Sequence, residues 1–191
     1  MKQIGVLGLQ GAVQEHLDKL SQIDNVDAFS AKYRSDIENC DGLIIPGGES
    51  TAIGRLLADF NLTQPLKARI EAGMPVWGTC AGMIILAKNI SNDARRHLEV
   101  MDIEVMRNGY GRQLDSFFTS VSVPQVSDAE IPLVFIRAPY VVDVAPQVEV
   151  LLRLDEHIVA CRQDNMLATS FHPELTNDLS FHRYFAEMIN K

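Results

Sequence analysis

Short apolar runs separated by amphipathic stretches make up the first half of the chain. Residues 3–9 and Asp41–Ile45 predict buried parallel strands, because unbroken aliphatic runs are typical of strands that are covered on both faces. A helix is expected from about Ala12 to Ile23, and Val26–Ala31 predicts a short second strand. Strands that alternate with helices in this way indicate an α/β fold around a parallel sheet.

Three more helices are predicted before the middle of the chain. The first runs through Ile53–Phe60, and either Ser50 or Thr51 is placed to cap its N-terminus. The second covers Gln64–Ala72 and ends where a glycine follows. The third, from about Gly82 to Lys88, comes directly after a short apolar strand. The parallel βα pattern therefore continues to about residue 88.

The second half alternates apolar with polar residues, which is typical of strands. Because no helical segment separates several of these strands, we expect an antiparallel addition to a mostly parallel sheet. No repeat or linker divides the sequence, so residues 1–191 are expected to form one domain. The predicted strands are Leu98–Arg107, Phe117–Val123, Leu133–Arg137, Val148–Leu154, Ile158–Gln163 and Met166–Phe171, and the closing helix is Leu179–Ile189.

Composition narrows the class of protein. A net charge of −8 without any run of Lys or Arg argues against a nucleic-acid partner. Cys40, Cys80 and Cys161 are too few and too far apart for a disulfide framework or a zinc site, and their odd number suits a reducing compartment. The first twenty residues carry charges that do not fit a signal peptide, and no apolar run approaches the length of a membrane span. We therefore expect a cytoplasmic protein.

The first candidate for chemistry is Cys80, at the centre of Gly78-Thr79-Cys80-Ala81-Gly82. A Gly-x-nucleophile-x-Gly pattern between a strand and a helix is typical of a nucleophile elbow, in which glycines avoid clashes at a sharp turn. The start of the following helix would favour a thiolate, and the N–H of Ala81 would face an oxyanion. The alternative is that Cys80 is simply a small buried hydrophobe.

The loop Pro46-Gly47-Gly48-Glu49 follows the second buried strand. Consecutive glycines at a strand end expose backbone N–H groups that can donate to an anion or a carbonyl oxygen. A plain tight turn explains this stretch equally well. The glycines at positions 5, 8 and 11 do not have the dinucleotide-binding spacing, so tight packing is preferred for them and no cofactor is expected.

A base for Cys80 is available in His172, which follows another predicted strand. Glu174 lies two residues further on, and side chains at i and i+2 share a face of an extended chain. The carboxylate can then orient the imidazole, which activates the thiol. Both motifs follow strands, and the carboxyl ends of strands are where open α/β sheets bind ligands. The other histidines, His16, His97, His157 and His182, lack such a setting and are interpreted as surface residues.

With these motifs the sequence resembles the class I (triad) glutamine amidotransferases. It is most similar to the branch that serves as glutaminase subunits of pyridoxal 5′-phosphate synthase. The resemblance covers nearly the whole chain and implies a flavodoxin-like three-layer fold. It rests on Ile4–Ala12, Pro46–Ser50, Gly78–Gly82, Arg107-Asn108 with Gly111-Arg112-Gln113 and Asp115–Phe117, Phe135–Pro139, and Phe171–Glu174.

The resemblance also implies roles for individual residues. Cys80, His172 and Glu174 would form the catalytic triad, and Gly48 and Ala81 would supply the oxyanion hole. Glutamine would be hydrolysed to glutamate, and the ammonia would pass to a PdxS-type synthase subunit in a ring-shaped complex; no metal or cofactor is implied. The residues implied to bind glutamine are Gly48, Glu49, Ser50, Arg107, Ile136 and Arg137.

Some questions stay open at the level of sequence. Arg107 and Arg137 are both candidates to pair with the substrate α-carboxylate, and either alone is an ordinary surface charge. A stand-alone γ-glutamyl thiol hydrolase and a non-catalytic regulatory subunit remain alternative functions on the same fold. The docking surface, the stoichiometry and the activity of the isolated chain do not follow from the sequence.

Overall fold

A central ten-stranded sheet organises the protein, which is described by a computed structural model that defines residues 1–110 and 116–189. Its strand order is β2-β1-β3-β4-β12-β11-β9-β6-β5, with β10 paired to β11. The first five of these strands are parallel neighbours. Their bounds are Val26–Ala31 (β2), Lys2–Leu7 (β1), Gly42–Ile45 (β3), Val76–Thr79 (β4) and Met166–Thr169 (β12).

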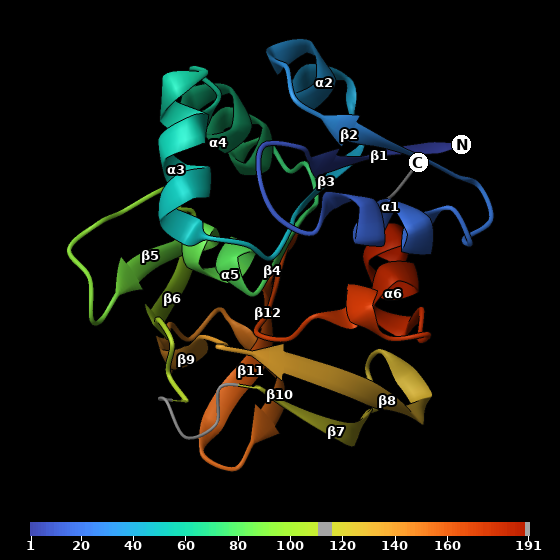
Figure 1. Cartoon of the computed structure of the whole chain (residues 1–191), viewed down its shortest axis with the longest axis vertical. Coiled ribbons are helices and arrows are strands. Elements are labelled where there is room, and N and C mark those ends of the chain that lie inside the picture. The colour runs from blue at the N-terminus through green and yellow to red at the C-terminus, as the bar shows by residue number, and fades with distance from the viewer. Residues whose placement is uncertain (111–115, 190–191) are drawn as a thin grey trace.

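Beyond β12 the sheet becomes largely antiparallel, as the alternating second half of the sequence predicts. Strand β11 pairs antiparallel with β12, β10 and β9, and β6 pairs antiparallel with β9. A separate antiparallel hairpin, β7–β8, lies to the right of β10 in the lower part of Figure 1. The bounds are His157–Gln163 (β11), Tyr140–Val144 (β9), Met101–Met106 (β6), Ala87–Ile90 (β5), Glu149–Leu154 (β10), Ser116–Val123 (β7) and Ser127–Ile136 (β8).

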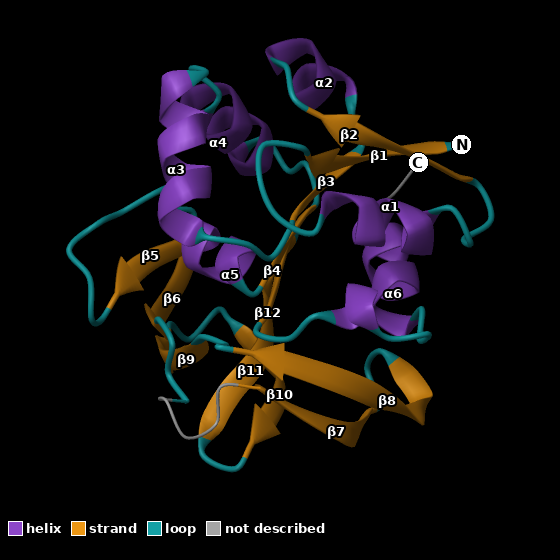
Figure 2. Cartoon of the chain, viewed as in Figure 1, coloured by secondary structure: helices purple, strands orange, loops and turns teal. Residues whose placement is uncertain are grey.

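Helices cover both faces of the parallel half and make the fold three-layered (Figure 2). Helices α1 and α6 lie together on one side, and α3, α4 and α5 lie on the other. A short 3-10 turn, η2, connects β12 to α6. The bounds are Val13–Leu20 (α1), Arg34–Asn39 (α2), Ser50–Asp59 (α3), Thr63–Glu71 (α4), Ala81–Leu86 (α5), Pro173–Leu175 (η2) and Ser180–Met188 (α6).

Two apolar cores follow from the twofold alternation of side chains along each strand. On β3, Leu43 and Ile45 belong to the core under α3, α4 and α5, whereas Ile44 belongs to the core under α1 and α6. On β4, Val76 and Trp77 divide in the same way. Both faces of the central strands are thus buried, which is why their sequences read as unbroken apolar runs.

Several details differ from the sequence prediction, including β6 and β12, which are shorter than predicted. Helix α2 and strand β9 were not predicted, because Arg34–Asn39 is polar and short and Tyr140–Val144 alternates for only a few residues. Strand β8 begins at Ser127, well before the predicted Leu133, because its antiparallel partner β7 extends the pairing. Lys88 lies in β5 and not in a helix.

The cap of α3 also differs from the prediction. Its N-cap is Glu49, whose carboxylate accepts a hydrogen bond from the backbone N–H of Thr51. Ser50 and Thr51 lie one and two residues inside the helix. Glu49 thus starts the helix as well as lying in the glycine loop.

Among the described residues, no helix is long and apolar enough to cross a membrane.

Candidate active site

Cys80 sits on a strained turn between β4 and α5. Its backbone angles are φ 49° and ψ −103°, in a region that L-residues rarely occupy. Its N–H donates to the carbonyl of Thr169 on β12, 2.8 Å away. A Cβ on Gly78 would lie 2.4 Å from the Gly82 carbonyl, and one on Gly82 would lie 2.1 Å from the Ile45 carbonyl oxygen. Both glycines are therefore required for the elbow, as the motif predicts.

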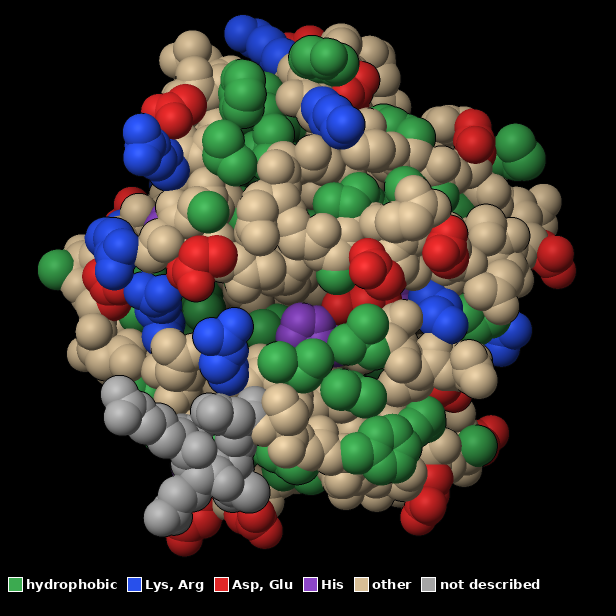
Figure 3. Space-filling view, viewed as in Figure 1, with side chains coloured by type: hydrophobic (Ala, Val, Ile, Leu, Met, Phe, Trp, Pro, Cys, Tyr) green, Lys and Arg blue, Asp and Glu red, His purple; other side chains and the backbone are tan. Residues whose placement is uncertain are grey.

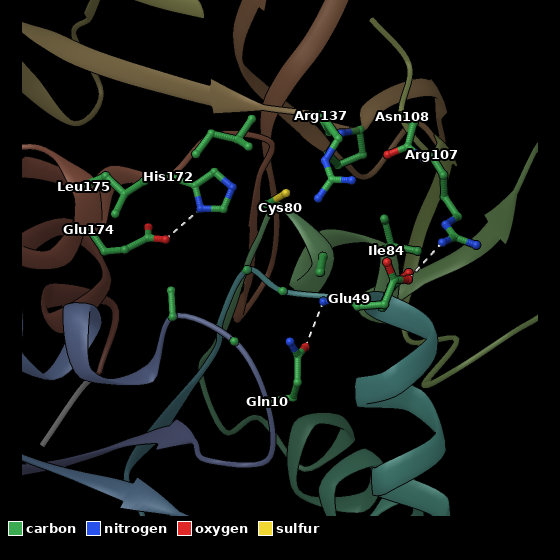
Figure 4. Close-up of a pocket in the computed structure, with 18 of the residues that line it drawn as sticks. Gln10, Glu49, Cys80, Ile84, Arg107, Asn108, Arg137, His172, Glu174 and Leu175 are labelled. Atoms are coloured by element: carbon green, nitrogen blue, oxygen red, sulfur yellow. Dashed lines mark hydrogen bonds and ion pairs between the residues drawn. The ribbon is translucent and has the colours of Figure 1, made fainter. Parts of the chain in front are cut away.

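His172 and Glu174 lie side by side after β12. The distance from His172 Nδ1 to Glu174 Oε1 is 2.7 Å, and the Glu174 side chain is fully buried (Figure 4). The predicted pairing is present, but the backbone is not extended, since His172 caps the 3-10 turn η2. The N–H of His172 also donates to the carbonyl of Val134 on β8, so the hairpin holds this segment in place.

His172 is electrostatically coupled to Cys80. Burial lowers the pKa of His172, but a hydrogen bond with Cys80, the hydrogen bond with Glu174 and the charges of both groups outweigh it and raise the pKa to about 10. Because Nδ1 is bonded to Glu174, the other ring nitrogen is left to face the thiol. The arrangement favours a protonated His172 imidazolium beside Cys80 at neutral pH.

A cavity of about 490 Å³ opens beside Cys80. Figure 3 shows a hollow in the middle of this face, where histidine surface is visible between acidic and basic side chains. This cavity brings together every residue for which the sequence predicts a catalytic or binding role. Its lining includes Gly48, Glu49, Ser50, Cys80, Ala81, Arg107, Ile136, Arg137, His172 and Glu174.

The two candidate arginines are in different electrostatic settings. Arg107 is already engaged, with Nη2 at 3.1 Å from Glu49 Oε1 and Nη1 at 2.5 Å from Asp93 Oδ2. Arg137 makes no side-chain hydrogen bond or ion pair with the residues that the structure describes, and its guanidinium points into the cavity towards Cys80 (Figure 4). It follows β8 with a φ of 42°, a left-handed conformation that turns the chain at the cavity rim.

Glu49 supplies a negative charge to the same cavity. Burial raises the pKa of Glu49, but hydrogen bonds from Thr51 and the charges of Arg107 and Arg137 outweigh it, so that the pKa is lowered overall. The Glu49 side chain is 57% exposed and can meet a ligand. An ionised carboxylate therefore faces the cavity opposite the guanidinium of Arg137.

Sequence reasoning assigned no role to the side chain of Gln10, although it lies in a quoted motif. Its Oε1 accepts a hydrogen bond from the backbone N–H of Glu49 at 2.8 Å (Figure 4). The same oxygen would be 2.4 Å from a Cβ on Gly48. Gln10 thus holds the glycine loop against the end of β1. The position of Gln10 directly after a predicted buried strand was the feature of the sequence that could have indicated this role.

The interpretation of His16 and His182 as surface residues is wrong. Both are fully buried between the sheet and helices α1 and α6. His16 Nε2 lies 3.5 Å from Glu174 Oε2 and 3.2 Å from Thr79 Oγ1. The signal was present in the sequence, since Val13, His16 and Leu20 have the spacing of one face of a helix.

Among the sequence segments that carry the resemblance, residues 111–115 lie outside the described residues.

A cysteine elbow, a His–Glu pair and a mostly parallel sheet define a class I glutamine amidotransferase. The sequence profile of the SNO glutamine amidotransferase family matches residues 6–191. The chain is 80% identical to the pyridoxal 5′-phosphate synthase subunit PdxT of Ruminiclostridium cellulolyticum, over 99% of this chain and 100% of that protein. It is 54% identical to the PdxT subunit of Caldanaerobacter subterraneus subsp. tengcongensis, over 97% and 98%. The protein belongs to the SNO glutamine amidotransferase family, and its family is enzymatic.

Solved structures agree with this assignment. A crystal structure described as a glutamine amidotransferase superposes with a TM-score of 0.91 at 40% identity, covering 97% of this chain and 98% of that one. The PurLQS structure from Thermotoga maritima has a TM-score of 0.70 at 15% identity, over 98% of this chain and 97% of that one. At that identity the second similarity concerns the fold alone.

Proposed function

We propose that this protein is the glutaminase subunit of a pyridoxal 5′-phosphate synthase and hydrolyses L-glutamine through Cys80, His172 and Glu174. The observation that carries the proposal is the buried 2.7 Å contact between His172 and Glu174, on the wall of a cavity that also holds Cys80. The 80% identity to a PdxT subunit over nearly the full length supports the same substrate. We further propose that residues 1–191 act as one glutaminase domain in the cytoplasm.

The first half-reaction transfers the glutamyl group to the enzyme. The Cys80 thiolate attacks the side-chain amide carbon of glutamine, and the carbonyl oxygen becomes an oxyanion. The His172 imidazolium then donates its proton to the amide nitrogen, which leaves as ammonia. A thioester of Cys80 remains, and the charge of Glu174 stabilises the imidazolium until its proton has been transferred.

The second half-reaction releases glutamate. Neutral His172 takes a proton from water as the water attacks the thioester, and the thiolate leaves from the second tetrahedral intermediate with the imidazolium restored. Backbone N–H groups of Gly48 and Ala81 donate to the oxyanion in both halves. Each such donor contributes about 3 to 4 kcal/mol to transition-state stabilisation in comparable sites.

Substrate recognition follows from the charges around the cavity. A glutamine whose amide carbon meets Cys80 carries an α-carboxylate and an α-ammonium at its other end. We assign the carboxylate to Arg137, because its guanidinium points into the cavity without a protein partner in the described part of the chain. Glu49 would bind the ammonium group. Arg107 would act mainly by holding Glu49, while Ser50 and Ile136 complete the wall.

The ammonia would serve a PdxS-type synthase subunit, in a hetero-oligomer in which a ring of synthase subunits carries glutaminases. The test is ammonia release from glutamine by the purified chain, with and without such a synthase. The Cys80→Ala variant is the control for each condition. We expect turnover that depends on the synthase and is absent in the variant.

Two outcomes would overturn this proposal. Full activity without the synthase, together with cleavage of larger γ-glutamyl substrates, would identify a stand-alone thiol hydrolase. No turnover under either condition, with Cys80 alkylation unaffected by glutamine, would indicate a non-catalytic regulatory subunit.

A further inference from the structure

The second carboxylate oxygen of Glu174 needs a donor that the triad does not supply. Oε1 is bonded to His172, whereas Oε2 is buried and accepts no hydrogen bond from the described residues. A buried carboxylate oxygen without a donor is costly. His16 Nε2 lies 3.5 Å from this oxygen and 3.2 Å from Thr79 Oγ1, so the two oxygens share one ring N–H, and the longer contact can tighten when substrate binds.

A second histidine sets which nitrogen of His16 carries the proton. His16 Nδ1 lies 2.9 Å from His182 Nε2, so one of the two rings donates to the other. Within the described residues, His182 Nδ1 is buried without a partner. A buried N–H group without an acceptor is rarer than a buried acceptor without a donor. His182 Nδ1 is therefore the unprotonated nitrogen, and Nε2 carries the proton. His182 Nε2–H then donates to His16 Nδ1, and His16 Nε2–H donates to Thr79 Oγ1 at 3.2 Å, with Glu174 Oε2 at 3.5 Å from the same nitrogen as the second acceptor within reach.

Both rings are held neutral by their surroundings. Burial, followed by the charges of His182 and His172, lowers the pKa of His16 well below 6.5. Burial and the charge of Lys19 lower the pKa of His182 to about 3. A neutral donor matters here because an imidazolium at His16 would compete with His172 for the charge of Glu174. From the sheet side, Trp77 packs edge-on against both rings and adds no charge.

We propose that His16 is a positioning residue that donates from Nε2 to Glu174 and so fixes the carboxylate that orients His172, with His182 selecting the tautomer of His16. The chain of contacts then runs Cys80–His172–Glu174–His16–His182, from the cavity to the core between α1 and α6. This inference rests on the proposed glutaminase function for its kinetic consequence, but its geometry can be tested without turnover.

Two substitutions at position 16 separate donation from packing. The amide nitrogen of His16→Gln can replace Nε2–H, whereas His16→Leu fills a similar space with no donor. We expect His16→Leu to reduce kcat for glutamine about 10- to 100-fold in the complex with the synthase, with KM little changed, as is typical when an orienting hydrogen bond is lost. His16→Gln should recover most of that loss. Leu20→Val, on the same helix, controls for lost stability and should leave kcat unchanged.

A second readout uses the isolated chain. Cys40 and Cys161 are almost fully buried, and burial raises their pKa values to about 11 and about 12, so iodoacetamide should modify mainly Cys80. Because His172 is hydrogen-bonded to Cys80, an imidazole that is less well oriented should make the thiol less reactive. The pH profile of the alkylation rate should therefore be lower near neutral pH in His16→Leu and stay near the wild-type profile in His16→Gln.

The outcomes distinguish the two proposals. Wild-type protein that releases no ammonia, but whose alkylation profile still responds to His16→Leu, contradicts the glutaminase function and supports the positioning role. Wild-type turnover with an unchanged kcat and an unchanged alkylation profile in folded His16→Leu overturns the positioning role. An equal loss in His16→Leu and His16→Gln also overturns it, because packing and not donation would then be responsible.

Discussion

At the scale of single residues, Gly47 separates the nucleophile from the base. A Cβ at this position would lie 2.5 Å from His172 Cε1 and 3.4 Å from the Cβ of Cys80. The first distance is shorter than real carbon contacts, so any side chain here must push the imidazole aside. The motif predicted an oxyanion role for the glycine loop. The steric role of Gly47 could not be predicted from the sequence, because it depends on where His172 and Cys80 lie in the folded protein.

Gly47→Ala is therefore expected to reduce kcat about 100-fold, because a displacement of the imidazole by about 1 Å is enough for such a loss. It should also cost about 1 to 3 kcal/mol in free energy of unfolding through overpacking. A double-mutant cycle with His172→Ala, measured by urea denaturation, checks the cause. If the cost of Gly47→Ala is the same with and without the imidazole, the steric explanation is wrong.

The two arginines of the cavity should differ in their effect on substrate binding. Arg137→Ala removes a charged hydrogen-bond donor from the proposed α-carboxylate site, which is worth about 2 kcal/mol, or roughly 30-fold in KM for glutamine. Arg107→Ala should raise KM less, because Arg107 already pairs with Glu49 and Asp93. Steady-state glutaminase kinetics of both variants provide the measurement. A larger KM effect at Arg107 would reverse the assignment.

At the scale of elements, the parallel half of the sheet was predictable and parts of the rest were not. Strands β1 and β3 are nearly where their apolar runs place them, because strands buried on both faces leave an unbroken signal. The pairing of β9, which is flanked by β11 and β6, depends on neighbours distant in sequence. The burial of His16 could have been predicted from the helical spacing of Val13, His16 and Leu20, but its contact with His182 depends on α6 packing beside α1.

The β7–β8 hairpin supports the base through an aromatic stack. Phe135 is 1% exposed, stacks on Phe117 at a centroid distance of 4.4 Å, and meets Phe171 edge-on, one residue before His172. Phe135→Ala is expected to lower the free energy of unfolding by about 3 to 5 kcal/mol. Phe118→Ala is the matched control on the same hairpin, because Phe118 is 64% exposed and its loss should change stability by less than about 0.5 kcal/mol. Urea denaturation measures both free energies of unfolding. Equal losses in the two variants would contradict the proposed support of His172 by the hairpin.

At the scale of the whole molecule, the state of the active site contributes to stability. The pKa of His172 is raised to about 10 in the folded protein, above its ordinary value near 6.5. Its contribution to stability is therefore complete below about pH 6.5 and is lost as the pH rises towards 10, since the folded state holds a proton that the unfolded state has released. The free energy of unfolding should decrease over this range.

The comparison of interest is with Cys80→Ala, which removes the thiol that helps to raise the pKa of His172. Its stability should fall less steeply between pH 6.5 and pH 10 than that of the wild type. Denaturation at several pH values measures both slopes. Parallel slopes would show that Cys80 and His172 are not coupled in the folded protein.

The register of β4 and β12 has a consequence for how the enzyme tolerates change. Thr79 and Thr169 are paired across the two strands, and the backbone N–H of Cys80 bonds to the second of them. The nucleophile and the base thus emerge from adjacent strands, whose separation of about 4.8 Å is common to all sheets. Mutational drift in the surrounding loops can remodel the cavity while this spacing persists. Natural sequence variation should therefore change which substrates the pocket accepts more readily than it changes the reaction of the thiol and the imidazole.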